Sequence, residues 1–322
     1  MHIEQRRGGL TETLHPVSAA LWADGAVRWS VGPDIASFWR SGCKALQLTS
    51  SLNNLPAEIV AGLTEQELAI GAASHSAEPL HVERVVGLLD RFGLTEADLR
   101  CGAHRPMHEP SARALERKGE KPSQLHNNCS GKHTFMRAAA RYSGWPADYR
   151  DPDHPLQREN LARMTEWMGE APAVAVDGCG VPSFHGRLSA MARAVARLAE
   201  EMGTRAVPGT GTTARIGWAM HRNPRFMSGE GRLDLLVVEG ATEPLTVKVG
   251  AEGLFTIALP DRQAGLVVKC HTGNDAALAV AVAAVLDRVY PGILRADAVG
   301  GWSWGTVLNV VGVRVGDRRA VW

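Results

Sequence analysis

Lysine is scarce in this chain, and three of its lysines stand beside nucleophilic or metal-binding side chains. Only six of the 35 basic residues are lysine, so arginine supplies most of the plain positive charge. A lysine can lose its proton under the conditions in which an arginine keeps its own. Lys44, Lys132 and Lys269 each lie close to serine, cysteine or histidine in the sequence. These three lysines are therefore candidates for proton transfer or metal ligation.

The segment Ser41-Gly42-Cys43-Lys44 is the single Ser-x-x-Lys of the chain. Residues three apart at a helix start share one face, so a neutral Lys44 amine can reach the Ser41 hydroxyl. This arrangement predicts a Ser-Lys nucleophile pair, and the neighbouring Arg40 is suited to bind an anionic group of a substrate. The alternative interpretation is an N-cap serine followed by a surface lysine.

Two separated segments carry a potential soft metal site. Cys129, Lys132 and His133 would share one face of a helix, at positions i, i+3 and i+4. Asp177 and Cys179 follow an apolar run within a glycine-rich turn. Two cysteines with nitrogen ligands suit zinc, although the spacing matches no standard zinc finger. Two buried cysteines that act only as small apolar residues are the alternative.

Two further polar segments are candidates for the same site. Ser74-His75-Ser76 interrupts two helical patterns and indicates either an active-site loop or a helix cap. Lys269 stands at the end of a predicted strand and is followed by Cys270-His271-Thr272-Gly273. The β-lactamase class carries a Lys-Thr-Gly segment at a comparable position.

The surrounding pattern predicts strands at both ends and a helical block between them. Two β-prone runs flank Asp24-Gly25 within residues 16–31, which predicts a hairpin. Helical periodicity begins at Ser41 and recurs in 65–73, 81–92, 129–141, 155–167, 186–202 and 275–290. Strands are expected at 234–239, 245–250, 254–259, 265–270 and 306–321. This order predicts an α+β fold with an antiparallel sheet, and the loop at 105–126 is a candidate flap.

Composition excludes several classes of function. The 322 residues are 45% hydrophobic and 21% charged, so a disordered chain is not expected. The net charge of +1 provides no overall electrostatic attraction to nucleic acid or an anionic membrane. The longest apolar run, 276–286, is too short to span a bilayer, and the N-terminus lacks an apolar signal core. Five cysteines fit a reducing compartment, so we expect a cytoplasmic protein with one catalytic domain over 1–322.

Several of these motifs together resemble the L-asparaginase II family, the Rhizobium etli type of bacterial L-asparaginase, which is unrelated to the threonine-dependent type. The most specific matches are Asn127–His133, Asp151–Gln157 and Asp177–Pro182. The resemblance extends over nearly the whole chain, through 40–41, 74–76, 249–253, 269 and 309–316. It implies a serine β-lactamase-like fold, a homodimer, and an amidohydrolase that converts L-asparagine to L-aspartate and ammonia.

The resemblance also implies roles for individual residues. Ser41 resembles the nucleophile and Lys44 its base, while Lys269 with Ser74, or with Ser76, resembles a second Ser-Lys tandem. The implied zinc ligands are Cys129, Lys132 and Cys179, with water as the fourth. His133 and Asp177 resemble substrate-binding neighbours of the metal, and Arg40 belongs to the same substrate group. The sequence departs from the family pattern at Cys43, at Cys270 and at Thr256, which stands where a cysteine is expected.

Two other classes of function remain as alternatives. A penicillin-recognising serine hydrolase is disfavoured because the chain lacks a Ser-Asp-Asn motif and an export signal. A zinc-stabilised module without catalytic activity is disfavoured because structural zinc sites have four protein ligands. Preference for asparagine over glutamine stays open, since one methylene provides only about 1–3 kcal/mol of discrimination.

Overall fold

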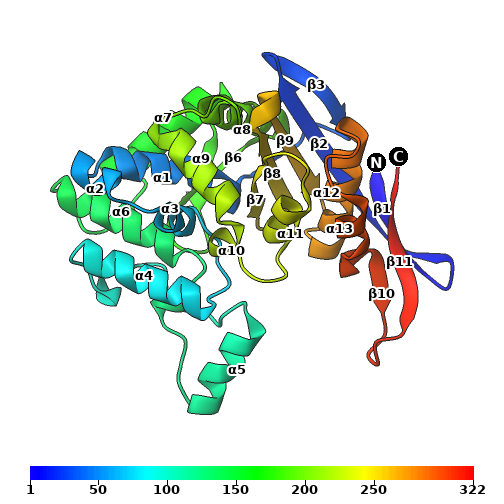
Figure 1. The fold of residues 1–322 in the computed structure, drawn as a ribbon, viewed down its shortest axis with the longest axis horizontal. Helices are drawn as coiled ribbons and strands as arrows, with labels where there is room; N and C mark the ends of the chain where they lie inside the picture. The colour runs from blue at the N-terminus through cyan, green and yellow to red at the C-terminus, as the bar shows by residue number, and fades with distance from the viewer.

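The two ends of the chain meet in one antiparallel sheet of the computed structural model, which describes residues 1–322 (Figure 1). β1 pairs with β11, and His2 lies opposite Val321. The strand order is β10-β11-β1-β2-β9-β8-β7, with β3 paired to β2, and a small second sheet has the order β4-β6-β5. The strands are β1 His2–Arg7, β2 Leu10–Ala23, β3 Ala26–Val31, β4 Ala36–Phe38, β5 Ala173–Val176, β6 Pro182–Arg187, β7 Thr246–Gly250, β8 Leu254–Leu259, β9 Ala264–Cys270, β10 Thr306–Leu308 and β11 Arg314–Val321.

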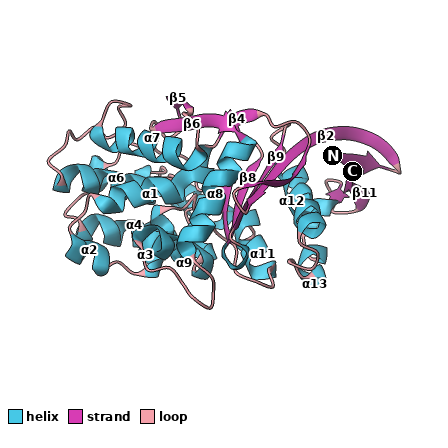
Figure 2. Cartoon of the chain, turned by 90° about the horizontal axis from the view of Figure 1, so that it is seen from above, coloured by secondary structure: helices cyan, strands magenta, loops and turns pink.

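Helices cover both faces of the large sheet and form a separate block beside it. Helix α8 packs against β2, β8 and β9, while α12 packs on the opposite face (Figure 2). At Gly265 a side chain would collide with the backbone of α8, so this glycine allows the close helix–sheet contact. The helices are α1 Lys44–Asn53, α2 Ala57–Ala61, α3 Glu65–Gly71, α4 Pro79–Arg91, α5 Glu109–Lys118, α6 Ser130–Tyr142, α7 Pro155–Met168, α8 Leu188–Met202, α9 Thr212–Arg222, α10 Pro224–Met227, α11 Leu233–Gly240, α12 Asp275–Val289 and α13 Ala296–Gly300.

The predicted α+β class and antiparallel sheet are confirmed by this arrangement. The hairpin at Asp24-Gly25 joins β2 to β3, and both turn residues have positive φ, as a tight two-residue turn requires. The strand predicted at 234–239 is wrong, because this segment lies within α11. Its apolar residues are too few to distinguish a buried strand from a short buried helix by periodicity alone.

A close contact between two helices fixes the segment that carries the thiols. Gly131 in the first turn of α6 lies against α3, where an added Cβ would come 2.2 Å from the Ile70 carbonyl oxygen. Only glycine permits this approach without movement of the backbone. The contact places the start of α6 beside the loop that follows α3. No helix of the structure is long and apolar enough to cross a membrane.

Candidate active site

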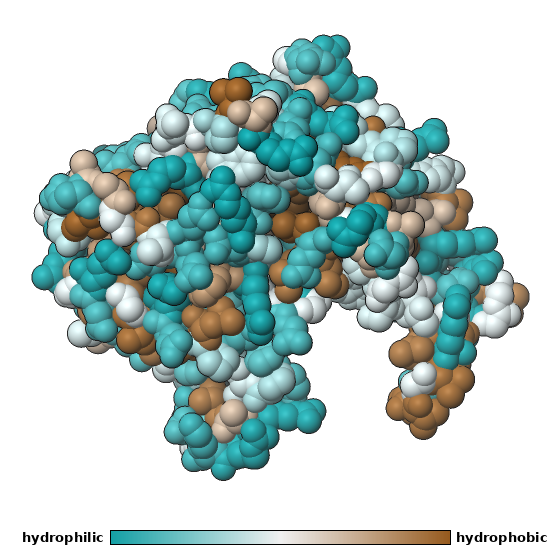
Figure 3. All heavy atoms as spheres, viewed as in Figure 1, coloured by the Kyte–Doolittle hydropathy of each residue, from teal (hydrophilic) through white to brown (hydrophobic).

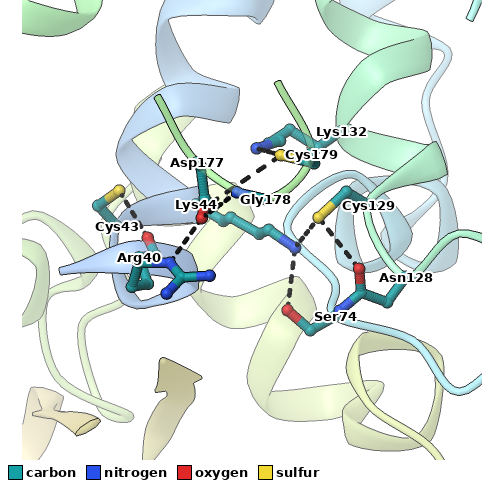
Figure 4. A network of polar contacts seen from close by, with 10 residues as sticks. All are labelled: Arg40, Cys43, Lys44, Ser74, Asn128, Cys129, Lys132, Asp177, Gly178 and Cys179. Atoms are coloured by element: carbon teal, nitrogen blue, oxygen red, sulfur yellow. Dashed lines mark hydrogen bonds and ion pairs between the residues drawn. The ribbon is translucent and has the colours of Figure 1, made fainter. Parts of the chain in front are cut away.

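The buried Lys44 amine is the centre of a polar network at the start of α1 (Figure 4). Its Nζ donates to the Ala73 carbonyl at 2.6 Å, to Ser74 Oγ at 2.9 Å and to Cys129 Sγ at 3.1 Å. Three acceptors match the three N–H donors of an ammonium group. The predicted Lys44 therefore lies in a site assembled from three separate segments, namely α1, the loop after α3 and the start of α6.

The loop after α3 presents Ser74, and not Ser76, to Lys44. Its backbone is held on both sides, since Ser74 N donates to Met227 O and His75 N donates to Asn128 O. Ser76 Oγ instead donates to Glu78 Oε1 at 3.1 Å. Of the two serines considered as partners of Lys269, Ser74 therefore contacts Lys44 and Ser76 contacts Glu78.

Ser41 lies in a 3₁₀ turn that spans Arg40–Cys43 and leads directly into α1. Its side chain has no hydrogen-bond partner and the residue is partly exposed, whereas Ser74 is only 3% exposed. Arg40 precedes it with a φ of 51°, a left-handed conformation that is costly for a residue with a Cβ. Such strain is retained where the surrounding structure enforces it. Ser41 is therefore the serine of this site that a small molecule can reach.

Cys129 and Cys179 are brought together although fifty residues separate them in the sequence. Both are buried, and Lys132 Nζ lies 3.2 Å from Cys179 Sγ. A hydrogen bond from the Cys179 thiol, assisted by the charges of Lys44 and Lys132, holds the pKa of Cys129 well below its usual value. Burial lowers the pKa of Lys132, but the charges of Cys179 and Cys129 outweigh this and raise it.

The predicted substrate-binding residues surround these thiols. Arg40 Nε donates to Asp177 Oδ1 at 2.5 Å, so the two residues form an ion pair. His133 is fully buried, and its Nδ1 lies 2.9 Å from the Tyr149 hydroxyl. That hydroxyl also accepts from Arg100 N, and the other ring nitrogen of His133, Nε2, has no hydrogen-bond partner. Burial holds the pKa of His133 well below its usual value, so the ring stays a neutral donor.

Lys248 is a further buried lysine, close to the site, that the sequence did not reveal. It is buried on β7, a strand that packs against the Ser41 turn, and its Nζ donates to the Val249 carbonyl at 2.9 Å. Its nearest carboxylate, Asp234, lies 4.0 Å away. Burial lowers the pKa of Lys248 to about 7, and the positive charge of Lys44 contributes to the shift. No serine or cysteine stands beside Lys248 in the sequence, so only its burial distinguishes it.

A comparison with models of known protein families identifies the family of this chain. The family model described as L-asparaginase II matches residues 3–320. The chain belongs to the L-asparaginase II family. No curated protein sequence matches the chain.

Two solved structures are similar to this L-asparaginase II family member at low sequence identity. A β-lactamase from Mycobacterium bovis, Mb2281c, has a TM-score of 0.44 and 13% identity, with 85% of this chain and 95% of that chain covered. Mglu in its native form has a TM-score of 0.44 and 14% identity, with 84% of this chain covered. The chain spans 63% of the length of Mglu, which is less than two thirds.

The second tandem expected for an L-asparaginase II protein is not formed by Lys269 and Ser74. Lys269 Nζ donates to the Glu252 carbonyl, and Ser74 accepts from Lys44. Register explains the difference: β9 places Lys269 between Ser18 of β2 and Leu254 of β8, away from the loop after α3. Burial lowers the pKa of Lys269, and the charge of Arg40 adds to this shift. Lys269 therefore remains a candidate for proton transfer on the side of the site where Arg40 lies.

The three departures from the L-asparaginase II pattern have structural roles. Cys43 Sγ donates to the Arg40 carbonyl, and burial raises its pKa to about 12, so this thiol is an unreactive packing residue. Thr256 Oγ1 donates to the Lys248 carbonyl and lies beneath Gly42. Cys270 is fully buried at the end of β9.

The predicted zinc ligands form a plausible donor set only if lysine is included. No group of three or more histidine, cysteine, aspartate or glutamate side chains is positioned to hold a metal ion. Cys129, Cys179 and Lys132, however, are buried in mutual contact and offer two sulfurs and one nitrogen. Thiolate and amine donors suit zinc, and three protein ligands leave one position free. The residues present therefore fit a zinc ion.

Proposed function

We propose that this L-asparaginase II protein hydrolyses L-asparagine to L-aspartate and ammonia with Ser41 as nucleophile. The observation that carries the proposal is the buried Lys44–Ser74 hydrogen bond of 2.9 Å directly behind an accessible serine. A primary amide is a poor electrophile, so its cleavage needs an activated hydroxyl and a proton for the departing ammonia. The cluster supplies both from adjacent side chains.

The proton relay consists of Ser41, Lys44 and Ser74, with Lys248 as the group that can be neutral near pH 7. Ser41 Oγ attacks the side-chain amide carbon and its proton passes to a neutral lysine amine. Ammonia departs with that proton, and a β-aspartyl ester of Ser41 remains. Water then hydrolyses the ester by the same relay. Lys248 fits the acceptor role because its pKa of about 7 matches the operating pH.

The substrate's amino-acid end is positioned by the charged residues beside the thiols. Asp177 is the carboxylate for the α-ammonium group, and Arg40 is the cation for the α-carboxylate, each after release from their ion pair. The unpartnered Nε2 of His133 is the ring nitrogen that would donate to a substrate oxygen in the tautomer with its proton there. These three side chains recognise the α-amino acid, while selection of asparagine over glutamine depends on chain length.

We also propose that Cys129, Lys132 and Cys179 hold a zinc ion. Zinc would supply a fixed positive charge that orients the substrate and neighbouring carboxylate. Binding requires deprotonated ligands; the pKa of Cys129 is lowered in this cluster, while the raised pKa values of Lys132 and Cys179 mean that zinc would have to displace their protons. Five free buried cysteines agree with a reducing, cytoplasmic setting, and we expect the functional form to be a homodimer.

The decisive experiment locates the acyl group. Purified protein is mixed with asparagine, quenched in acid and digested, and the peptide that carries the aspartyl ester is identified by mass spectrometry. We expect the ester on Ser41 in the wild type, no ester and no ammonia release in Ser41→Ala, and slow release with Ser41 still labelled in Ser74→Ala. Near-normal ammonia release by Ser41→Ala would refute the mechanism. Parallel assays with glutamine and a chromogenic β-lactam test the substrate class.

A further inference from the structure

The hairpin between β10 and β11 ends in an exposed apolar tip. The hairpin tip comprises Leu308, Asn309, Val310, Val311, Gly312 and Val313, and its four large apolar side chains are all exposed, Val310 completely and Val311 by 76%. Figure 3 shows the apolar tip projecting from the lower right of the molecule. Single exposed apolar residues are common on protein surfaces, but a contiguous group of them marks an interaction site.

A groove of matching character lies between α4 and α5. This α4–α5 groove has a volume of about 550 Å³ and is lined mainly by aliphatic side chains. Val82 and Val86 form its α4 wall, while Ala114 and Leu115 form its α5 wall. α5 belongs to the segment whose composition indicated a flap, and only Ala112 of this helix is buried. Because α5 buries so little of its surface, few contacts within its own chain stabilise its position.

Charge at the two surfaces is complementary. Glu83 is exposed, is the only carboxylate that lines the α4–α5 groove, and has no ion-pair partner in the chain. Arg314 adjoins the hairpin tip and is exposed; its nearest carboxylate, Asp317, lies 4.0 Å away and is already bound to Arg6 at 3.0 Å. An unpaired acid beside the groove and a base with only a 4.0 Å ion pair beside the tip favour contact between the two surfaces.

The position of the two surfaces allows a closed assembly of two chains. Both α5 and the β10–β11 hairpin project from the lower edge of the molecule in Figure 1, and Figure 3 shows an open notch between them. The hairpin tip cannot enter the groove of its own chain without rearrangement across this notch. A two-fold axis, in contrast, brings each hairpin to the groove of the other chain, and the same contact is then made twice.

We propose that the hairpin tip of one copy docks into the α4–α5 groove of a second copy. This inference rests on the homodimer of the proposed function and names the surfaces that form it. Val310 and Val311 fill the groove, and Arg314 pairs with Glu83 of the other chain. The groove is also lined by Ala77, three residues after Ser74. The docked tip therefore also covers the loop that carries the Ser74 side of the active site.

Light scattering coupled to gel filtration tests the contact on the full chain. We expect the wild type to have the mass of two chains, and Val311→Asp and Val86→Asp each to raise the dimer dissociation constant by about 100-fold or more. Val207→Asp is the matched control, because Val207 is 75% exposed outside both surfaces. A dimer that persists in both variants at low concentration, or a monomeric wild type, would overturn the proposal.

Mixing the two variants distinguishes this contact from general destabilisation. In a mixed pair, Val86→Asp contributes an intact tip and Val311→Asp an intact groove, so one of the two contacts is restored. We expect mixed dimers at concentrations where each variant alone is monomeric. The charge pair gives a second test: Glu83→Arg and Arg314→Glu should each weaken the dimer, and the double variant should recover it. Absence of recovery in both tests would refute the tip–groove pairing.

Ammonia release is measured on the same samples to separate the two proposals. Asparaginase activity in a monomeric wild type would leave the proposed function intact and overturn only the dimer contact. A dimer without activity towards asparagine would overturn the function and leave the contact standing.

Discussion

Two buried lysines, Lys44 on α1 and Lys248 on β7, lie in opposite electrostatic surroundings within one site. Lys44 has three acceptors, among them the Cys129 sulfur at 3.1 Å. Lys248 has one carbonyl acceptor and a carboxylate at 4.0 Å, and its pKa falls to about 7. A lysine with three acceptors is a positioned donor, while a buried lysine with few is suited to receive a proton. The fold thus separates two tasks between residues of the same type.

The largest effect is expected at Lys44. Lys44→Met removes the donor to Ser74 and Cys129 and leaves these buried groups without their partner, so kcat should fall by about 10³-fold or more. Lys44→Arg should be similarly inactive, because the guanidinium is larger and keeps its protons. Ammonia release at saturating asparagine measures the effect, with the exposed Lys121→Met as control. A loss below about tenfold would show that Lys44 is only a packing residue.

A smaller but more diagnostic effect is expected at Lys248. Activity of the wild type should rise with pH through about 7, as Lys248 loses its proton. Lys248→Met should lower kcat by about 10²-fold or more and abolish this limb of the pH profile. Lys269→Met is the matched comparison, since the sequence favoured Lys269 as the second lysine. If Lys269→Met removes the rise of activity near pH 7 and Lys248→Met does not, then Lys248 is not the proton acceptor.

Removal of the thiols tests the zinc proposal. Cys129→Ser and Cys179→Ser should each lose the metal, measured by elemental analysis, and raise KM by about 10–100-fold because substrate positioning depends on the metal. Cys101→Ser serves as the control, since Cys101 is a buried cysteine outside the cluster. One zinc per chain should be retained in the control and lost in the double cluster variant. Full zinc in the double variant would exclude these ligands.

A change in stability with pH is also expected at Lys248. The pKa of Lys248 is about 7 in the folded chain and about 10.4 when unfolded, so only the unfolded state holds this proton between those values. The free energy of unfolding should therefore rise from pH 7 to 10, with a contribution of up to about 1.4 kcal/mol per pH unit, and Lys248 should add no pH dependence below pH 6, where both states hold the proton. Denaturant titrations of the wild type and Lys248→Met measure the two slopes. Equal slopes would mean that Lys248 is not neutral in the folded chain.

The sequence by itself determined the family and the α+β class, and it supplied most of the candidate site residues. These features depend on local patterns: Ser41 and Lys44 are three residues apart, Cys129 and Lys132 likewise, and the hairpin at Asp24-Gly25 needs only a two-residue turn. The interpretation of 234–239 failed because short apolar runs fit a buried helix as well as a strand.

Only the tertiary structure decided which of these groups meet. Lys44 and Ser74 are thirty residues apart, Cys129 and Cys179 fifty, and their contacts depend on the packing of α3 against α6 at Gly131. Sheet register directed Lys269 to the Glu252 carbonyl and away from Ser74. Burial is the main cause of the low pKa of Lys248, and the charge of Lys44 adds to it; both depend on the tertiary surroundings of the amine and not on its neighbours in the sequence.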